Sequence, residues 1–433
     1  MRTLRTASLA LAASLVFACG APARDTDGGQ DAGTGSGRDG GGSTSTTDGG
    51  SDGGVRTDAG TDGGSAAPPD AGCVRALAPE DAPRVVAVSH PFPSDGGSKD
   101  NRYELFTLQS NGTLTPRNVE FRMGRASVAS GFVSFTPDGK VGLVPQDDGS
   151  LGVFRVEADG GVSVVHAAYA GGFSAGQVLM HPSGNRAFVT DFNVRSNGGG
   201  LYSVDIGCDG SLSNPQRVLA GDNASAATWL EPGTRALVAS RSLGTSPAGQ
   251  DLHLVDLGSN AVLSSAAGFP DRDGIPPTVS VSADGRWVAL PDNSFFVDPQ
   301  RIAFFERVSG ALVSRQVLDT TAPVGVAFSP WTTGGVLVQS DTADAYRMVS
   351  FDAASSTFSL AASPLTYAHG RPQLPSPPLL LERGALRGRV LVGELDSIRQ
   401  LQFEPHGTLT DVSRTPASGT GSAKIVGTLG VSP

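Results

Sequence analysis

The chain has 433 residues, a formal net charge of −10 and 17% charged residues, with 58 glycines and 29 prolines. This composition favours many turns and a β-rich fold. The sequence has no basic patch and no Lys/Arg-rich helix, so nucleic acid is excluded as an expected partner.

The N-terminus has the pattern of an export signal, predicted to occupy residues 1–18. Basic residues precede an apolar run, Ala7–Ala18, which is too short to span a bilayer as a helix. The run ends in Val-Phe-Ala-Cys-Gly. This motif resembles the lipobox of bacterial lipoproteins, and the resemblance implies lipidation at Cys19 and anchoring to a membrane. Because Gly20 follows, known sorting rules imply the outer membrane of a Gram-negative-type cell envelope. An ordinary signal peptide with an incidental cysteine is the alternative.

Residues 19–72 are predicted to form a disordered linker. They are rich in Gly, Asp and Ser and almost free of apolar side chains, so they cannot offset the entropy cost of ordering. A flexible chain of about fifty residues reaches roughly 40 Å on average. The Asp-Gly spacing fits neither the EF-hand loop nor the calcium-binding nonapeptide repeat, so no metal or cofactor is expected here.

Two cysteines remain, Cys73 and Cys208. Cys73 lies where the linker meets the domain, and Cys208 lies in a predicted turn at 207–210. An exported compartment permits a disulfide. A bond between the two would fix the start of the domain to a later repeat; two unpaired thiols are the alternative.

The stretch 132–165 consists of short apolar runs separated by turn residues. The runs lie at 132–135, 141–144, 151–156 and 162–165. Asp-Gly turns between strands of this length indicate antiparallel hairpins. A four-stranded sheet cannot bury both of its faces alone, so it needs neighbours of its own kind.

Related patterns supply those neighbours, at 84–121, 178–218, 228–265, 279–318, 326–361 and 378–413. The turns at Pro137, Pro182, Pro232 and Ala283 are 45, 50 and 51 residues apart. A β-unit that repeats every 40–50 residues indicates a propeller blade. We therefore predict an all-β fold over residues 73–433, a seven-bladed β-propeller of four-stranded antiparallel blades.

The two ends of the domain predict ring closure. Lys424–Pro433 resembles the first strand of a repeat, whereas Arg84–Ser89 resembles a second strand that has no first strand before it. We expect the C-terminal strand to complete the first blade, which removes the open edge between the first and last blades.

Short turns join strands one and two of each repeat, and loops of variable length join strands two and three. In antiparallel blades these two sets lie on opposite faces. Variable loops on a rigid scaffold usually carry function, so we expect the site on the loop face. Polar residues near the ends of the second strands could form a collar around the channel mouth and bind a ligand: Asp147, Asp191, Arg241, Asp292, Asp341 and Glu394. The alternative is that these aspartates form Asx turns.

His369 and Arg371 lie on a predicted loop of the same face and could serve an acid/base or anion-binding role, or belong to a plain loop. HExxH, P-loop and CxxC motifs do not occur in the sequence, and the two GxSxG matches, at 49–53 and 172–176, lie in the low-complexity segment and in a predicted blade-connecting loop rather than between a strand and a helix. Zinc, serine-hydrolase, nucleotide and dithiol chemistry therefore have no support.

Three segments, FTPDGKVGLVP, HPSGNRAFVTDF and SADGRWVALPD, resemble repeats of the lactonase-like seven-bladed propellers. That family includes 6-phosphogluconolactonase-type enzymes and many binding proteins. The resemblance covers nearly all of residues 84–433 and implies the fold, but no positions match the family's catalytic residues.

The expected protein is therefore a membrane-tethered, exported, monomeric propeller without a cofactor. It binds a small molecule, a glycan or a protein through its loop face. The alternative is a lactonase-type hydrolase of a cyclic ester.

Overall fold

A computed structural model describes much of the chain from Cys73 onward, namely residues 73–91, 100–124, 132–146, 150–165, 175–192, 199–272, 274, 276–293, 299–340, 344–418 and 425–433. The predicted signal peptide, Cys19 and the linker lie outside the described residues. Among the residues that the structure describes, no helix is long and apolar enough to cross a membrane.

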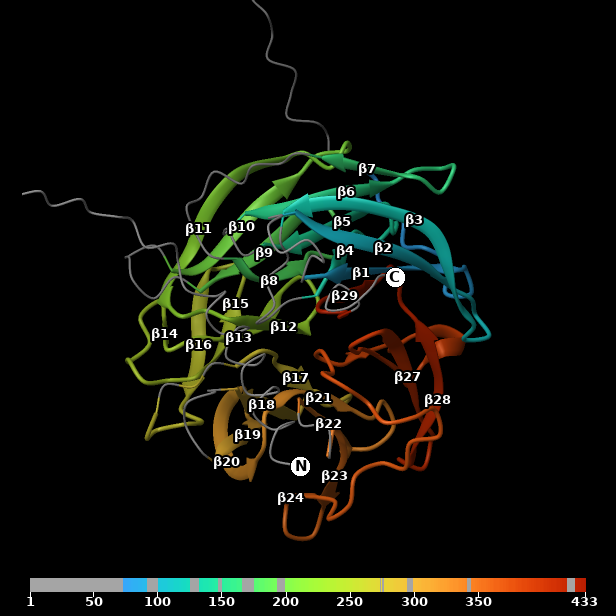
Figure 1. Ribbon diagram of the computed structural model, residues 1–433. Helices are drawn as coiled ribbons and strands as arrows, with labels where there is room; N and C mark the ends of the chain where they lie inside the picture. The colour runs from blue at the N-terminus through green and yellow to red at the C-terminus, as the bar shows by residue number, and fades with distance from the viewer. Residues whose placement is uncertain are drawn as a thin grey trace, which may run out of the picture. The chain divides into compact units, whose positions relative to one another are not determined.

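The described strands form seven antiparallel sheets around a ring (Figure 1). Blade one contains β29 (Leu429–Val431), β1 (Arg84–His90), β2 (Asp100–Leu108) and β3 (Leu114–Gly124). Blade two contains β4 (Ser134–Phe135), β5 (Val141–Pro145), β6 (Leu151–Val156) and β7 (Val162–Val165). Blade three contains β8 (Ala175–Met180), β9 (Arg186–Asp191), β10 (Gly200–Ile206) and β11 (Leu212–Asp222). Blade four contains β12 (Ala226–Glu231), β13 (Arg235–Ala239), β15 (Leu252–Asp256) and β16 (Ala261–Ala266).

The last three blades repeat the same order. Blade five contains β17 (Ser280–Val281), β18 (Trp287–Asp292), β19 (Gln300–Val308) and β20 (Ala311–Thr320). Blade six contains β21 (Pro323–Phe328), β22 (Gly335–Gln339), β23 (Tyr346–Asp352) and β24 (Thr357–Leu360). Blade seven contains β25 (Leu379–Leu380), β26 (Arg389–Gly393), β27 (Ser397–Phe403) and β28 (Leu409–Pro416). The predicted seven-bladed propeller is confirmed.

Turn chemistry explains where the strands end. Between β4 and β5, Gly139 takes a φ of +68°, a conformation that glycine adopts without strain. Its N–H donates to the carbonyl of Thr136 at 2.8 Å. The Asp138 carboxylate accepts hydrogen bonds from the Thr136 hydroxyl at 2.6 Å and from the backbone N–H of Lys140 at 3.2 Å. The turn therefore satisfies its own polar groups and reverses the chain.

The core lies between blades rather than within them. The buried side chains form seven clusters among the described residues, and each cluster joins two neighbouring sheets. Between blades five and six, for example, Trp287 and Phe304 meet Phe328 and Phe358. Each blade thus buries its two apolar faces against its neighbours, as a stacked ring requires.

Closure by the C-terminal strand is also confirmed. β29 pairs antiparallel with β1, with Leu429 opposite Val88. The carbonyl of Leu429 also accepts a hydrogen bond from the N–H of Val133, in blade two, at 3.1 Å. A Cβ atom at Gly430 would collide with the carbonyl oxygen of Val133. Only glycine therefore lets β29 approach the second blade so closely.

Two features add to the predicted pattern. A short strand, β14 (Ser242–Leu243), leaves the loop between β13 and β15 and pairs with β11, so the third sheet gains a fifth strand. In blade seven the turn after β25 contains a short 3₁₀ helix, η1 (Gly384–Leu386), and is longer than the other turns of its kind. Below, the face that carries the turns after the innermost strands is called the tight-turn face, and the opposite one the loop face.

Candidate functional site

A cavity of about 1160 Å³ lies at the centre of the ring. The innermost strand of every blade contributes to its wall, from β4 through β25 and including the closing strand β29. The wall continues into the turns that follow these strands, for example at Pro182, Asp284 and Pro330. The cavity is therefore the propeller's central channel, and it extends to the tight-turn face.

Positive charge dominates the side chains of this wall. Four arginines line the cavity, against two carboxylate side chains, Asp284 and Glu382. The arginines are Arg75, Arg307, Arg383 and Arg387. Because the whole chain carries a net charge of −10, this concentration of guanidinium groups favours an anionic ligand over a cationic one.

Backbone carbonyls hold three of these arginines in place. Arg75 donates to the carbonyl of Gly207 at 2.7 Å. Arg307 donates to Gly285 at 3.1 Å, and Arg387 donates to Pro330 at 3.0 Å while its guanidinium lies 5.6 Å from the Trp331 ring centroid. A carbonyl fixes the orientation of a guanidinium but does not neutralise its charge. Arg75 also lies 3.6 Å from the Asp138 carboxylate, and Arg307 lies 3.8 Å from the Glu231 carboxylate. Arg387 has no ion pair with a described carboxylate.

The segment 73–83, here called the N-terminal strap, runs along the tight-turn face. The structure joins Cys73 to Cys208 in a disulfide, with 5.4 Å between their Cα atoms. The carbonyl of Cys73 accepts a hydrogen bond from the Asn185 side chain at 3.1 Å, and the N–H of Ala78 donates to Pro137 at 3.1 Å. The strap therefore contacts blades three and two, and it brings Arg75 to the cavity wall.

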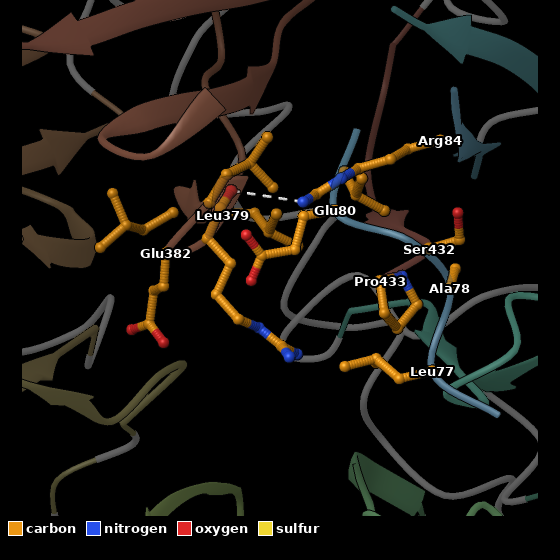
Figure 2. A pocket seen from close by; sticks show the side chains of 12 residues that line it. Leu77, Ala78, Glu80, Arg84, Leu379, Glu382, Ser432 and Pro433 are labelled. Atoms are coloured by element: carbon orange, nitrogen blue, oxygen red, sulfur yellow. Dashed lines mark hydrogen bonds between the residues drawn. The ribbon is translucent and has the colours of Figure 1, made fainter. Parts of the chain in front are cut away.

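A smaller hollow of about 270 Å³, here called the alcove, adjoins the cavity where the strap meets blade seven and the C-terminal residues (Figure 2). Arg84 and Glu80 line it on one side and Leu379 and Glu382 on the other. The alcove and the central cavity share several wall residues, among them Leu77.

On the loop face, Asp147 and Asp341 lie outside the described residues. The other predicted carboxylates, Asp191, Asp292 and Glu394, are each 0% exposed. Asp292 lies 3.7 Å from the guanidinium of Arg272. These three carboxylates are therefore enclosed by protein.

Glu394 belongs to a buried ionic network between blades six and seven. Arg399, also 0% exposed, donates to Glu394 at 2.6 Å and to Asp411 at 2.7 Å. Tyr346 donates its hydroxyl to Glu394 at 2.8 Å. Burial opposes the charge of Arg399, but the bond to Glu394 raises its pKa above the ordinary value. Burial, together with the Glu394 charge, raises the pKa of Tyr346. The network stabilises charges within the fold.

Arg241, the predicted cationic member of the collar, pairs with Asp251 at 3.0 Å and donates to the carbonyl of Arg272 at 3.0 Å. Asp251 in turn accepts hydrogen bonds from the N–H groups of Gly268 and Phe269 at 2.7 and 2.8 Å. Arg241 thus ties a loop of blade four to the segment leading into blade five.

His369 and Arg371 are both exposed. The imidazole Nδ1 of His369 lies 3.5 Å from a carboxylate oxygen of Asp411, and its backbone N–H donates to the same carboxylate at 3.0 Å. In the described part of the chain, no hydrogen bond or ion pair joins His369 to Arg371. The structure places a His–Asp contact here that the sequence did not reveal.

The sequence also did not reveal the arginines of the cavity and the alcove. Their relationship depends on contacts between distant parts of the chain, such as Arg75 with Gly207 and Arg84 with the carbonyl of Arg383. The one local signal was the unusual turn LERGALRG after β25, which carries two arginines in eight residues. Among the described residues, no group of three or more His, Cys, Asp or Glu is arranged to hold a metal ion.

Comparison with known proteins gives a fold. No protein-family model and no curated protein matches the sequence. A protein of Bacteroides uniformis, provisionally assigned as a 6-phosphogluconolactonase, superposes with a TM-score of 0.56 at 12% identity, over 81% of this chain and 99% of its own. A periplasmic gluconolactonase of Pseudomonas aeruginosa gives 0.52 at 14% identity, also over 81% and 99%. A protein of Lactobacillus plantarum gives 0.55 at 12% identity, with the same coverage. The chain therefore has the seven-bladed β-propeller fold of the 6-phosphogluconolactonase-like proteins.

Proposed function

We propose that the protein is an exported, lipid-anchored β-propeller that binds a small molecule in its central cavity and does not transform it. The observation that carries this proposal is the cavity of about 1160 Å³ with arginines at its tight-turn end. Pockets for small organic ligands commonly enclose about 300–1,000 Å³, so this cavity is somewhat larger than such pockets and has room for a ligand of that class. A few oriented polar groups on an otherwise apolar wall are typical of such sites.

The proposal places the ligand at a different end of the channel from the loop face that the sequence favoured. The described collar residues support this shift, because Glu394 and Asp292 are fully buried and Arg241 is paired with Asp251. A ligand that recruited these groups would have to break existing ion pairs, which is costly for buried charges. Of the cavity arginines, Arg75 and Arg307 have ion pairs at 3.6 and 3.8 Å, whereas Arg383 and Arg387 have none with a described carboxylate.

A cavity-filling substitution tests the site. Thr228 lines the cavity on β12 and is half-buried, so Thr228→Trp should occupy part of the volume. Titration calorimetry of the purified protein with D-gluconate, citrate, L-glutamate and D-glucose should detect at least one ligand with a dissociation constant below about 1 mM. Thr228→Trp should weaken that binding at least about tenfold.

The matched control is Thr115→Trp, because Thr115 is exposed on the outer strand β3. It should bind as the parent does. A panel in which nothing binds the parent, or binding that survives Thr228→Trp unchanged, would reject the cavity as the ligand site.

Membrane attachment through Cys19 has its own test. Cys19→Ser should move the protein from the membrane fraction to the soluble fraction of the cell envelope, because it removes the acylated thiol. Continued pelleting of the variant with membranes would refute lipid anchoring. The control is Ser43→Ala in the predicted linker, which leaves Cys19 and the disulfide intact and should stay in the membrane fraction.

A lactonase-type hydrolase is a second candidate, supported by the contact between His369 and Asp411. A carboxylate that orients an exposed imidazole is an arrangement that general bases use. Turnover of δ-gluconolactone or other sugar lactones that falls at least about a hundredfold in His369→Ala would establish this activity. If the parent hydrolyses no lactone above the spontaneous rate, the enzyme hypothesis fails for that panel.

A further inference from the structure

The geometry of the alcove points to a more specific ligand class. We propose that the alcove binds an oxyanion, the carboxylate or phosphate end of the ligand, between the guanidinium groups of Arg84 and Arg383. The inference rests on the proposed function, because the alcove opens beside the central cavity and shares Leu77, Leu379 and Arg383 with its wall. A ligand in the cavity could therefore place one charged end in the alcove.

Arg84 is a buried cation without a close counter-ion. It is 7% exposed, and its guanidinium donates to the carbonyl oxygen of Arg383 at 3.3 Å (Figure 2). No described carboxylate lies within 4.0 Å of it. A carbonyl dipole offsets only part of the cost of burying a full charge. The charge of Arg84 is therefore not neutralised by any described group.

Arg383 adds a second positive charge to the same wall. Its guanidinium is exposed and makes no hydrogen bond or ion pair with any described residue. Burial lowers the pKa of Arg84, and the neighbouring charge of Arg383 lowers it further. Two guanidinium groups that repel each other gain the most from an anion that binds both, and their planar N–H donors suit the paired oxygens of a carboxylate or phosphate.

The two acidic side chains of the alcove, those of Glu80 and Glu382, do not supply this anion. Glu80 partly opposes the lowering of the Arg84 pKa, yet it is exposed and remains beyond ion-pair distance. Figure 2 shows the Glu382 carboxylate pointing away from Arg84. The volume of about 270 Å³ leaves room for an oxyanion, and apolar side chains such as Leu77 and Leu379 form part of the wall. Reduced contact with water strengthens the attraction between the charges.

Titration calorimetry of the purified full chain with inorganic phosphate, and separately with acetate, tests the assignment at constant ionic strength. Arg383→Gln should weaken binding of the preferred anion at least about tenfold, because it removes a charge-assisted contact. Glu80→Gln should strengthen binding about two- to fivefold, because it removes a repelling carboxylate. Both residues are exposed, so neither substitution should disturb folding.

The matched control is Arg122→Gln, since Arg122 is exposed on the outer strand β3; its affinity should stay within about twofold of the parent. Preference for phosphate or for acetate identifies the oxyanion. Absence of binding of both anions by the parent, or equal affinities of Arg383→Gln and Arg122→Gln, would overturn the assignment.

The two proposals fail in distinguishable ways. If Thr228→Trp abolishes binding of the organic ligand but Arg383→Gln does not change anion binding, the alcove assignment is refuted and the cavity remains the ligand site. Anion binding that requires Arg383, together with no organic ligand sensitive to Thr228→Trp, supports the alcove and refutes the cavity as the main site.

Discussion

The closing strand makes a quantitative prediction through Leu429. This side chain is 1% exposed and packs in the cluster that joins blade one to blade seven, with Val88, Leu391 and Ile398. Leu429→Ala therefore acts at the junction between blades one and seven, where the first and last strands of the domain come together. If ring closure stabilises the whole propeller, weakening this junction should destabilise the entire fold.

The expected cost follows from burial. Replacing leucine by alanine removes three carbon atoms from a buried site, worth about 2.4 kcal/mol at about 0.8 kcal/mol for each. The space left behind adds a cavity term, which brings measured costs of such substitutions to about 2–5 kcal/mol. We expect a loss of about 3–4 kcal/mol in the free energy of unfolding, a large part of the 5–15 kcal/mol typical of a folded protein.

Urea denaturation followed by circular dichroism and tryptophan fluorescence measures this loss. With a slope of about 3 kcal/mol per molar urea, the midpoint of the first transition should fall by roughly 1 M. The control is Leu263→Ala on β16, where the leucine is 48% exposed, and its midpoint should move by less than about 0.3 M. Equal shifts for the two variants would refute the view that β29 closes the ring energetically.

Three further predictions concern the disulfide, the buried network and a buried histidine. Serine at both Cys73 and Cys208 opens a bridge between residues 135 positions apart, so stability should fall by about 2–4 kcal/mol in urea and become insensitive to dithiothreitol; a variant that still responds to dithiothreitol would contradict this. Arg399→Leu removes the buried cation that Glu394 and Asp411 share and leaves Glu394 with Arg414 alone, so it should cost about 3–5 kcal/mol, whereas Arg371→Leu, at an exposed site, should cost under about 0.5 kcal/mol; similar urea midpoints would disprove the role of the network. Burial lowers the pKa of His253 from 6.5 to about 4, so the folded state holds it neutral. Between pH 6.5 and 4 the unfolded state binds a proton at this histidine and the folded state does not, so the free energy of unfolding falls as the pH falls through this range. The total change is at most about 3 kcal/mol, and none of it is lost above pH 6.5. His253→Gln should remove this part of the pH dependence of the urea midpoint, and an unchanged profile would rule it out.

Local sequence patterns specified the strands, because the signals that end them are local. The runs 151–156 and 162–165 were predicted with the bounds that β6 and β7 have. The first strand of the same repeat was predicted at 132–135 but is confined to Ser134–Phe135. Its remaining residues face the neighbouring blade and the channel, where pairing depends on the approach of β29 and not on their own propensity.

The candidate site was harder to predict, because its residues meet only after the ring has closed. Arg84 and Arg383 are 299 residues apart in sequence, and only Arg383 lies in a locally unusual segment, the LERGALRG turn. The strand ends with Asp292 and Glu394 were visible in the sequence, but their complete burial was not. Burial depends on which side chains of the folded blades surround them, as Arg399 on β27 and Tyr346 of blade six surround Glu394. A repeat period of 45–51 residues predicts the position of a residue within its blade. It does not predict which charged side chains of other segments contact that residue.

The N-terminal strap and the proposed ligand site lie on the same face of the propeller, and under the proposed lipid anchoring this bears on how a ligand would enter. The strap that begins at Cys73 is fixed to the tight-turn face by the bond to Cys208 and by Arg75, which also lines the cavity. With a lipid at Cys19, the cavity would open on the side of the tether. If residues 19–72 form the flexible linker that the sequence predicts, their average reach would be roughly 40 Å, several times the width of a small ligand, so the anchor would keep the propeller near the membrane without closing its cavity. Shortening the linker to about ten residues would reduce that reach to under about 20 Å, and ligand affinity on membranes should then fall while affinity in detergent stays the same. Equal affinities in both settings would show that the tether does not limit access to the cavity.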